Sequence, residues 1–168
     1  FITLNEPQIV LKLGYADGVH APGKRYPLPQ LVQCWKNLML AHGLAFRAIC
    51  QAAPEAEIGI ASTGKLCYPH SPTDEAAAQQ ETFRLTDADW MFTHPIVLDA
   101  VCFGRIAPED GALSELLQTI TQEEWDTMHA IPDFIGVNSY NGSEIAADAN
   151  GQPLYLPRPK GFACTALK

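Results

Sequence analysis

The strongest pattern of apolar and polar positions runs from Leu28 to about Ala52. Apolar side chains recur there every three or four residues, which is the spacing of one face of an amphipathic helix. The positions that define this face are Leu31, Trp35, Leu38, Phe46 and Ile49. His42 falls on the same face, so we expect a hydrogen-bonded histidine between this helix and the rest of the fold rather than a ligand-binding residue. Pro54 should end the helix.

Short apolar runs elsewhere have the length of strands, at residues 1–4, 57–61 and 133–138. The second and third are continuous, which is typical of strands that a parallel sheet buries on both faces. Near the end of the chain, Asn150-Gly151 is a signal for a two-residue type I′ hairpin turn. We expect one arm of that hairpin to contain Ile145 and Ala146 and the other to contain Leu154, Tyr155 and Leu156.

Two helix starts lie between the predicted strands. Ser71-Pro72 followed by Asp74 has the form of an N-cap, a first turn and an acidic residue facing the helix dipole. The helix that they open should include Ala76, Ala77, Phe83 and Trp90. Thr121 with Glu124 is a capping box that opens a shorter helix containing Trp125 and Met128. Alternating strands and helices at these intervals predict an α/β fold with a parallel sheet.

Composition and charge exclude several classes of partner. The formal net charge is −8 and the 11 Lys and Arg residues form no cluster, so a nucleic acid partner is not expected. No apolar run approaches the length of a membrane helix, and we expect no membrane association.

The five cysteines are odd in number, widely spaced and lack a C-x-x-C motif, which indicates neither a zinc site nor a disulfide framework. They are Cys34, Cys50, Cys67, Cys102 and Cys164. Free, mostly buried thiols favour a reducing compartment, and we expect a cytoplasmic protein with no metal or cofactor.

Candidate chemistry lies at the end of the first strand, where Asn5, Glu6 and Pro7 follow one another. Pro7 should end the strand and restrict Glu6 to extended conformations, leaving a carboxylate at a rigid strand tip. Neighbouring residues of a regular strand point to opposite faces. Asn5 and Glu6 can therefore serve one site only if the strand bulges or ends between them, and we predict that it does.

Residues beyond this tip carry a resemblance to a known family. A loop rich in glycine follows the Thr-Leu-Asn-Glu-Pro motif, and its marker residues are Gly14, Tyr15, Gly18, Ala21, Pro22 and Gly23. Farther along, Asp-Phe-Ile-Gly-Val-Asn-x-Tyr spans residues 133–140. Together these segments resemble the acid/base strand, its loop and a later strand of the family 1 glycoside hydrolases, the β-glucosidase group.

The resemblance implies a segment of a (β/α)₈ TIM barrel, about strands four to six with their helices. A complete barrel usually needs about 250 residues, so residues 1–168 would form a partial glycosidase domain, with the remaining barrel segments as partners. The implied activity is a retaining β-glycosidase acting on a β-linked glucoside or oligosaccharide. The family's nucleophile lies in a Glu-Asn-Gly motif that this sequence lacks, so the segment alone should be inactive.

Residue roles follow from the matching motifs. Glu6 would be the catalytic acid/base, and Asn5 would bind the sugar hydroxyl next to the anomeric carbon. Asn138 would border the same site, and Tyr140 would hydrogen-bond the nucleophile that another segment supplies. Tyr15 and Tyr68 would pack or line the leaving-group side.

Four positions depart from the family's usual residues, and two alternatives to the main function remain open. The departures are Phe1, Gln8, Thr63 and Ser139. The first alternative is a 6-phospho-β-glucosidase, because the phosphate-recognising residues of such enzymes would lie outside this chain. The second is a non-catalytic carbohydrate-binding fragment.

Overall fold

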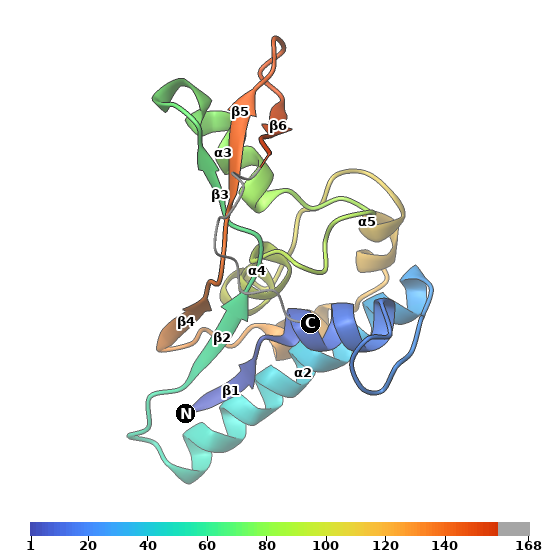
Figure 1. Ribbon diagram of the computed structural model, residues 1–168. Coiled ribbons are helices and arrows are strands. Elements are labelled where there is room, and N and C mark those ends of the chain that lie inside the picture. Colours follow the sequence, from blue (N-terminus) through green and yellow to red (C-terminus); the bar gives the residue numbers. More distant parts are fainter. Residues whose placement is uncertain (158–168) are drawn as a thin grey trace.

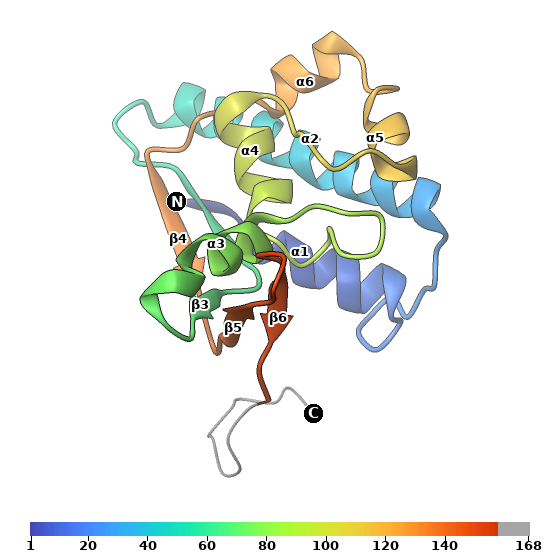
Figure 2. The ribbon, with the colours of Figure 1, turned by 90° about the horizontal axis from the view of Figure 1, so that it is seen from above.

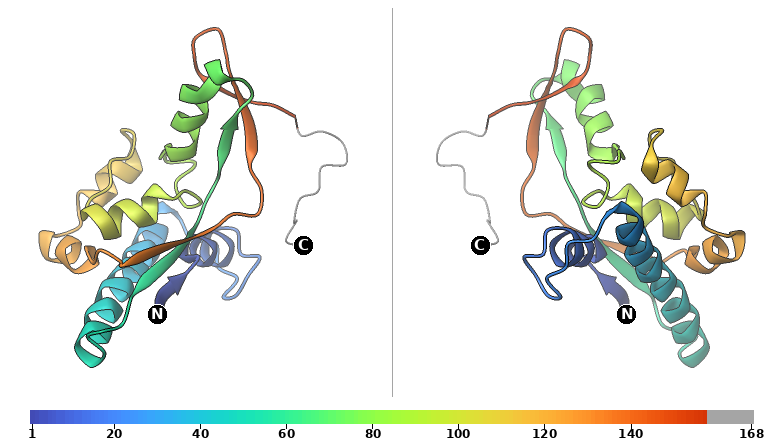
Figure 3. Two further views of the ribbon diagram at one scale, coloured as in Figure 1. Left: turned by 90° about the vertical axis from the view of Figure 1, so that its left-hand side faces the viewer. Right: turned by 90° about the vertical axis from the view of Figure 1, so that its right-hand side faces the viewer.

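A computed structural model describes residues 1–157 of the chain, which contain two three-stranded sheets (Figure 1). The first sheet is parallel in the order β1 (Ile2–Asn5), β2 (Gly59–Thr63), β4 (Phe134–Asn138). The second has the order β3 (Cys67–Pro69), β5 (Ser143–Ala147), β6 (Pro153–Tyr155), and only its β5–β6 pair is antiparallel. Figure 3 shows that β2 runs on into β3 and that β4 runs on into β5, so these two parallel pairs form one long ribbon.

Helices follow β1 and β2, whereas β4 continues into the strands of the smaller sheet. The elements are α1 (Pro7–Ile9), the π-helix η1 (Val10–Ala16), α2 (Leu28–Ala52), the 3₁₀ turn η2 (Pro72–Asp74), α3 (Glu75–Phe83), α4 (Pro95–Phe103), α5 (Ala112–Leu117) and α6 (Gln122–Met128). Viewed from above, α4, α5 and α6 lie around the long helix α2 (Figure 2). This is the expected run of βα units, with β3, β5, β6 and α3 as a second, smaller layer.

The long helix has the predicted bounds, and its apolar face forms the main core. Trp35 and Met39 are buried, and the Trp35 indole Nε1 donates to the Ile96 carbonyl at 2.8 Å. The Trp125 ring of α6 lies 6.1 Å from the Trp35 ring, between centroids. Period-3.6 apolar spacing thus predicted this element well, because the face it describes is buried against three other helices.

His42 lies in the interface as predicted. Its Nε2 lies 3.1 Å from the Ala130 carbonyl and its Nδ1 lies 2.7 Å from the Thr3 hydroxyl. A carbonyl only accepts, so in the neutral ring Nε2 carries the proton and Nδ1 accepts from Thr3. Burial lowers the pKa of His42. The hydrogen bond to Ala130 raises this pKa and the positive charge of Arg47 lowers it, so that the net shift is downward. His42 therefore ties α2 to β1 in its uncharged form.

A pH dependence of stability follows from His42. Below about pH 6.5 the unfolded chain binds a proton at this residue that the folded chain does not, so the free energy of unfolding falls as the pH drops. The slope from this one residue is at most about 1.4 kcal/mol per pH unit. Urea unfolding at several pH values should show a steeper decline for the wild-type protein than for His42→Gln, which cannot titrate. Parallel declines would contradict the prediction.

Several predicted details are wrong. β4 was expected to be buried, but Phe134, Ile135 and Val137 are exposed, and within residues 1–157 β4 is an edge strand that pairs only with β2. Trp90 lies beyond the end of α3, although it is buried in the core. Gly14 and Tyr15 belong to the helical segment η1 rather than to the loop.

The hairpin and the cysteines differ from expectation in part. The β5–β6 hairpin pairs Ile145 with Tyr155 and Ala146 with Leu154, as the sequence predicts. Its connection has five residues, 148–152, and only Gly151 has a positive φ, so the turn is not type I′. Cys34, Cys50, Cys67 and Cys102 are free, but of these only Cys67 is buried. Cys164 lies outside the described residues.

Within residues 1–157, no helix combines the length and the apolar character that crossing a membrane requires.

Candidate functional site

Glu6 stands where β1 ends and the first helix begins. Its backbone N–H donates to the Ala61 carbonyl of β2 at 2.8 Å, while Pro7 is already the first residue of α1. The chain changes direction at Glu6 alone, which has φ 47° and ψ 55°, in the left-handed region. The expectation of an extended Glu6 is therefore wrong: this residue is left-handed, whereas the residues that precede α2 and α6 are extended, as is usual before a helix. A non-glycine residue held in this region costs about 1–3 kcal/mol, and such strain gathers at functional sites.

Asn5 and Glu6 both accept a hydrogen bond from the Asn138 side chain, as expected if the strand is interrupted between them. The pairing of β1 with β2 shifts register between Ile2 and Asn5, and the strand ends at Asn5. The Asn138 amide Nδ2, at the end of β4, donates to Asn5 Oδ1 at 3.2 Å and to Glu6 Oε1 at 2.6 Å. The prediction that the strand ends between the two residues is confirmed.

Tyr140 completes the set of predicted site residues. Its hydroxyl donates to the same Glu6 Oε1 at 2.7 Å, and this hydrogen bond to a carboxylate raises the pKa of Tyr140. Asn5, Glu6, Asn138 and Tyr140 are thus brought together from chain positions more than 130 residues apart. One carboxylate oxygen receives two donors, and the position of the Glu6 side chain is thereby set by β4 and the residues that follow it.

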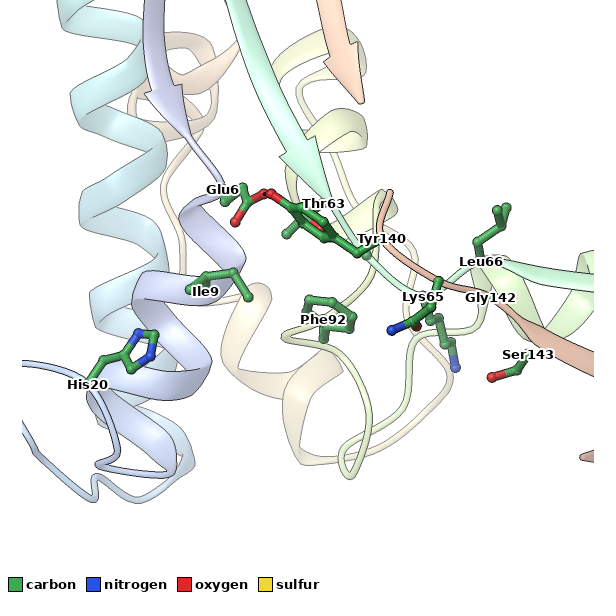
Figure 4. A pocket seen from close by; sticks show the side chains of 12 residues that line it. Glu6, Ile9, His20, Thr63, Lys65, Leu66, Phe92, Tyr140, Gly142 and Ser143 are labelled. Atoms are coloured by element: carbon green, nitrogen blue, oxygen red, sulfur yellow. Dashed lines mark hydrogen bonds between the residues drawn. The ribbon is translucent and has the colours of Figure 1, made fainter. Parts of the chain in front are cut away.

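Glu6 and Tyr140 line a cavity of about 700 Å³ at the carboxyl ends of the parallel strands (Figure 4). Ligands bind at this end of the strands in α/β folds. The walls contain apolar side chains, namely Ile9, Leu66 and Phe92, together with the ionisable residues His20 and Lys65. A carboxylate at the edge of a partly apolar hollow of this size suits a small organic substrate.

The ribbon between the two sheets forms one wall of this cavity. Thr63 pairs with Asn138, and the next pair along the ribbon is Cys67 with Ser143. Residues 64–66 on one side therefore face residues 139–142 on the other, so the second connection has one residue more. An extra residue breaks the alternation of side chains as a β-bulge does. Tyr140 lies two positions after Asn138, so both side chains are on the same side of the ribbon, where both contact Glu6.

Lys65 was not singled out in the sequence, and it lies two residues after the end of β2. Its ammonium group donates to Glu81 Oε1 and to Asp89 Oδ2, both at 2.7 Å. Burial opposes its charged form, but the hydrogen bonds to Asp89 and Glu81 outweigh this and raise the pKa of Lys65. The Tyr155 hydroxyl of β6 also donates to Glu81, at 2.8 Å. Lys65 thus connects the cavity wall to α3 and, through Glu81 and Tyr155, to the smaller sheet. The carboxylates of Glu81 and Asp89 balance its positive charge.

Comparisons with known proteins point to one family. The sequence profile of Glycosyl hydrolase family 1 matches residues 1–158. Beta-glucosidase 16 of Arabidopsis thaliana is 33% identical over 161 residues, which are 83% of this chain and 29% of that protein. The 6-phospho-beta-galactosidase of Staphylococcus haemolyticus is 25% identical over 82% of this chain and 32% of that protein.

A solved structure agrees with these relatives in fold. The beta-glucosidase from Thermotoga maritima in complex with noeuromycin superposes with a TM-score of 0.68 and 27% sequence identity. The match covers 94% of this chain and 34% of the Thermotoga chain. Neighbours of this kind are TIM-barrel enzymes, so the α/β class and the parallel strands predicted from the sequence are confirmed at that level. The chain spans about a third of the length of the proteins that it matches.

Proposed function

Since this chain belongs to glycosyl hydrolase family 1, we propose that it is part of a retaining β-glycosidase that hydrolyses terminal β-linked sugars. It would supply about strands four to six of a (β/α)₈ barrel, and other segments would supply the remaining strands. We call the protein with all eight strands the complete enzyme. Its similarity to beta-glucosidases from a plant and from a bacterium supports a β-glucoside as the substrate.

The observation that carries this proposal is the placement of Glu6. Glycoside hydrolysis needs a proton for the leaving oxygen and a second carboxylate to stabilise or attack the anomeric carbon. Glu6 is held at the edge of the cavity by Asn138 and Tyr140, at 2.6 and 2.7 Å. Only one of its oxygens is engaged in these contacts, so Oε2 can give a proton to a leaving group and later take one from water. We assign Glu6 the acid/base role.

Asn5 and Tyr140 would act around the reacting carbon. Asn5 shares the Asn138 amide with Glu6, which places its own side chain next to the proton donor, where the hydroxyl beside the anomeric carbon would lie. A contact to that hydroxyl strengthens in the transition state. The contact between Tyr140 and the nucleophile stays a prediction, because the Glu-Asn-Gly motif does not occur in this sequence.

The stereochemistry of the reaction tests this function. The complete enzyme is expected to cleave a phenyl β-glucoside and to release the β-anomer of glucose first, because two displacements restore the starting configuration. Proton NMR of the first turnovers distinguishes the two anomers before they interconvert. Initial release of the α-anomer, or cleavage of α-glucosides alone, would contradict the proposal. Residues 1–168 by themselves are the control and are expected to be inactive.

A phosphorylated sugar is the second candidate substrate, and the similarity to a 6-phospho-beta-galactosidase favours it. Steady-state kinetics separate the two substrates, since the ratio of kcat/KM for a β-glucoside and for its 6-phosphate shows which one the complete enzyme prefers. A fragment that only binds sugars would instead give saturable heat when cellobiose is titrated into residues 1–168, without hydrolysis.

A further inference from the structure

Gln8 is a buried polar side chain two positions after Glu6. Its amide Nε2 donates to the Ser62 hydroxyl oxygen at 2.8 Å and to the Thr93 carbonyl at 3.2 Å. Its Oε1 accepts from the Thr63 backbone N–H at 3.4 Å. Gln8 is 1% exposed, so water does not compete for these contacts. These hydrogen bonds fix the orientation of the buried Gln8 amide, and they also fix the position of the chain segment that carries it.

The hydrogen bonds around Gln8 continue in a defined direction. An amide nitrogen only donates, so Ser62 accepts from Gln8 and keeps its own proton for another partner. That partner is His94 Nδ1, which lies 3.0 Å from the Ser62 oxygen. Nδ1 then accepts and the ring proton lies on Nε2. Burial lowers the pKa of His94, in agreement with a neutral ring. The chain of contacts from Gln8 through Ser62 to His94 is therefore complete, with each group in a compatible role.

These contacts attach both sides of the Glu6 turn to the same strand. Before the turn, the Glu6 N–H is bonded to Ala61 of β2. After the turn, Gln8 is bonded to Ser62 and Thr63, the last two residues of β2. Glu6 lies between the two attachments in its left-handed conformation. Such a conformation persists only where the surroundings hold it, and Gln8 is the side chain that holds the helical side of the turn.

We propose that Gln8 is a positioning residue for proton transfer: by binding Ser62 and Thr63 it keeps the Glu6-Pro7 turn in place and aims the Glu6 carboxyl group at the leaving oxygen. This inference rests on the acid/base role proposed for Glu6. Without the Gln8 amide, the Ser62 hydroxyl, the Thr63 N–H and the Thr93 carbonyl lose a buried partner, and the turn can relax. A displacement of about 1 Å at a reacting group can cost about 100-fold in rate.

The test compares two substrates of the complete enzyme. A phenyl β-glucoside needs a proton on its leaving oxygen, whereas a dinitrophenyl β-glucoside does not. Gln8→Met keeps an unbranched side chain of similar length and removes all three hydrogen bonds. We expect it to lower kcat/KM for the phenyl substrate by about 10- to 100-fold and to change the dinitrophenyl value by less than about 3-fold, within the spread of an ordinary small perturbation. Equal losses on both substrates would overturn the inference.

Controls separate this inference from the proposed function. Glu6→Gln must itself affect the phenyl substrate selectively, and if it does not, the acid/base assignment fails rather than the role of Gln8. If Glu6→Gln is selective and Gln8→Met is not, the role of Gln8 fails. Thr82→Val removes another buried hydroxyl, bonded to the Cys67 N–H at 3.1 Å in the smaller layer. It should alter both substrates alike.

A second variant covers the case in which Gln8→Met does not fold. Ser62→Ala removes the partner of Gln8 and leaves the Gln8 side chain, so it should show the same selectivity with a smaller effect. If Ser62→Ala instead lowers kcat/KM for both substrates equally, the inference is overturned. Where Gln8→Met does fold, the double variant Gln8→Met/Ser62→Ala should lose no more than Gln8→Met alone, because the two residues share one interaction. Effects on the phenyl substrate that multiply would show that the two residues act independently and would overturn the inference.

Discussion

Glu6→Gln in the complete enzyme is expected to lower kcat/KM for phenyl β-glucosides by about 10²–10⁴-fold, the usual contribution of a general acid. The amide has the same shape and its oxygen can still accept from Asn138 and Tyr140, so the two contacts at 2.6 and 2.7 Å can remain. What the substitution removes is the acidic proton. The loss should therefore be one of chemistry rather than of structure.

The leaving group distinguishes this explanation from general damage. For a dinitrophenyl β-glucoside, kcat/KM should change little, because that group departs without protonation. Its kcat should nevertheless fall, because Glu6 is also the base that activates water in the second step. Steady-state kinetics on both substrates give these four values. Glu144→Gln is a matched control, since Glu144 is bonded to His70 in the smaller sheet and should leave both substrates unaffected. Equal losses of kcat/KM on both substrates would refute the role of Glu6.

Trp35→Ala is expected to lower the free energy of unfolding by about 3–5 kcal/mol, the cost of removing a large buried aromatic side chain. Trp35 lies in the middle of the main core, where its ring meets Trp125 of α6 and its indole N–H bonds to the Ile96 carbonyl of α4. The substitution opens a cavity between three helices and leaves that carbonyl without its donor. No other single truncation in α2 removes as large a buried side chain.

Two variants on the same helix calibrate the measurement. Trp35→Phe keeps most of the ring and loses the hydrogen bond, so it should cost clearly less than Trp35→Ala. Leu44→Ala truncates an apolar side chain that is 61% exposed and should change the free energy of unfolding by no more than about 0.5 kcal/mol. Urea unfolding of the complete enzyme, followed by circular dichroism, gives all three values. A cost below that of Leu44→Ala would show that Trp35 does not stabilise the core as described.

The sequence predicted well those features that depend on local spacing. Apolar positions every three or four residues identified α2 with its observed bounds, since this spacing depends only on the helical repeat. The capping box of Thr121 and Glu124 opens α6 as expected, because its hydrogen bonds join residues within one turn. The motif residues Asn5, Glu6, Asn138 and Tyr140 meet in space, which the resemblance to a family implied and spacing alone could not.

Features that depend on distant contacts were missed. The strand becomes a helix at Glu6 through a left-handed backbone, and nothing in Asn-Glu-Pro requires that conformation. Gln8 was noted only as a departure from the family's usual residue, whereas its partners come from β2 and from the segment before α4. The exposure of β4 depends on which strands lie beside it. Composition cannot show this, because an apolar strand has the same sequence whether or not a neighbour covers it.

Two connections of unequal length, residues 64–66 and residues 139–142, form one wall of the cavity. The structure of this wall should therefore be more sensitive to insertions and deletions than to most point mutations. Loss of a single codon between β4 and β5 would leave the reading frame intact, yet it would reverse the side-chain alternation of everything downstream in the strand. Ile145, now fully buried, would then turn outward. In relatives of this chain, insertions and deletions in these two connections should therefore occur as compensating pairs.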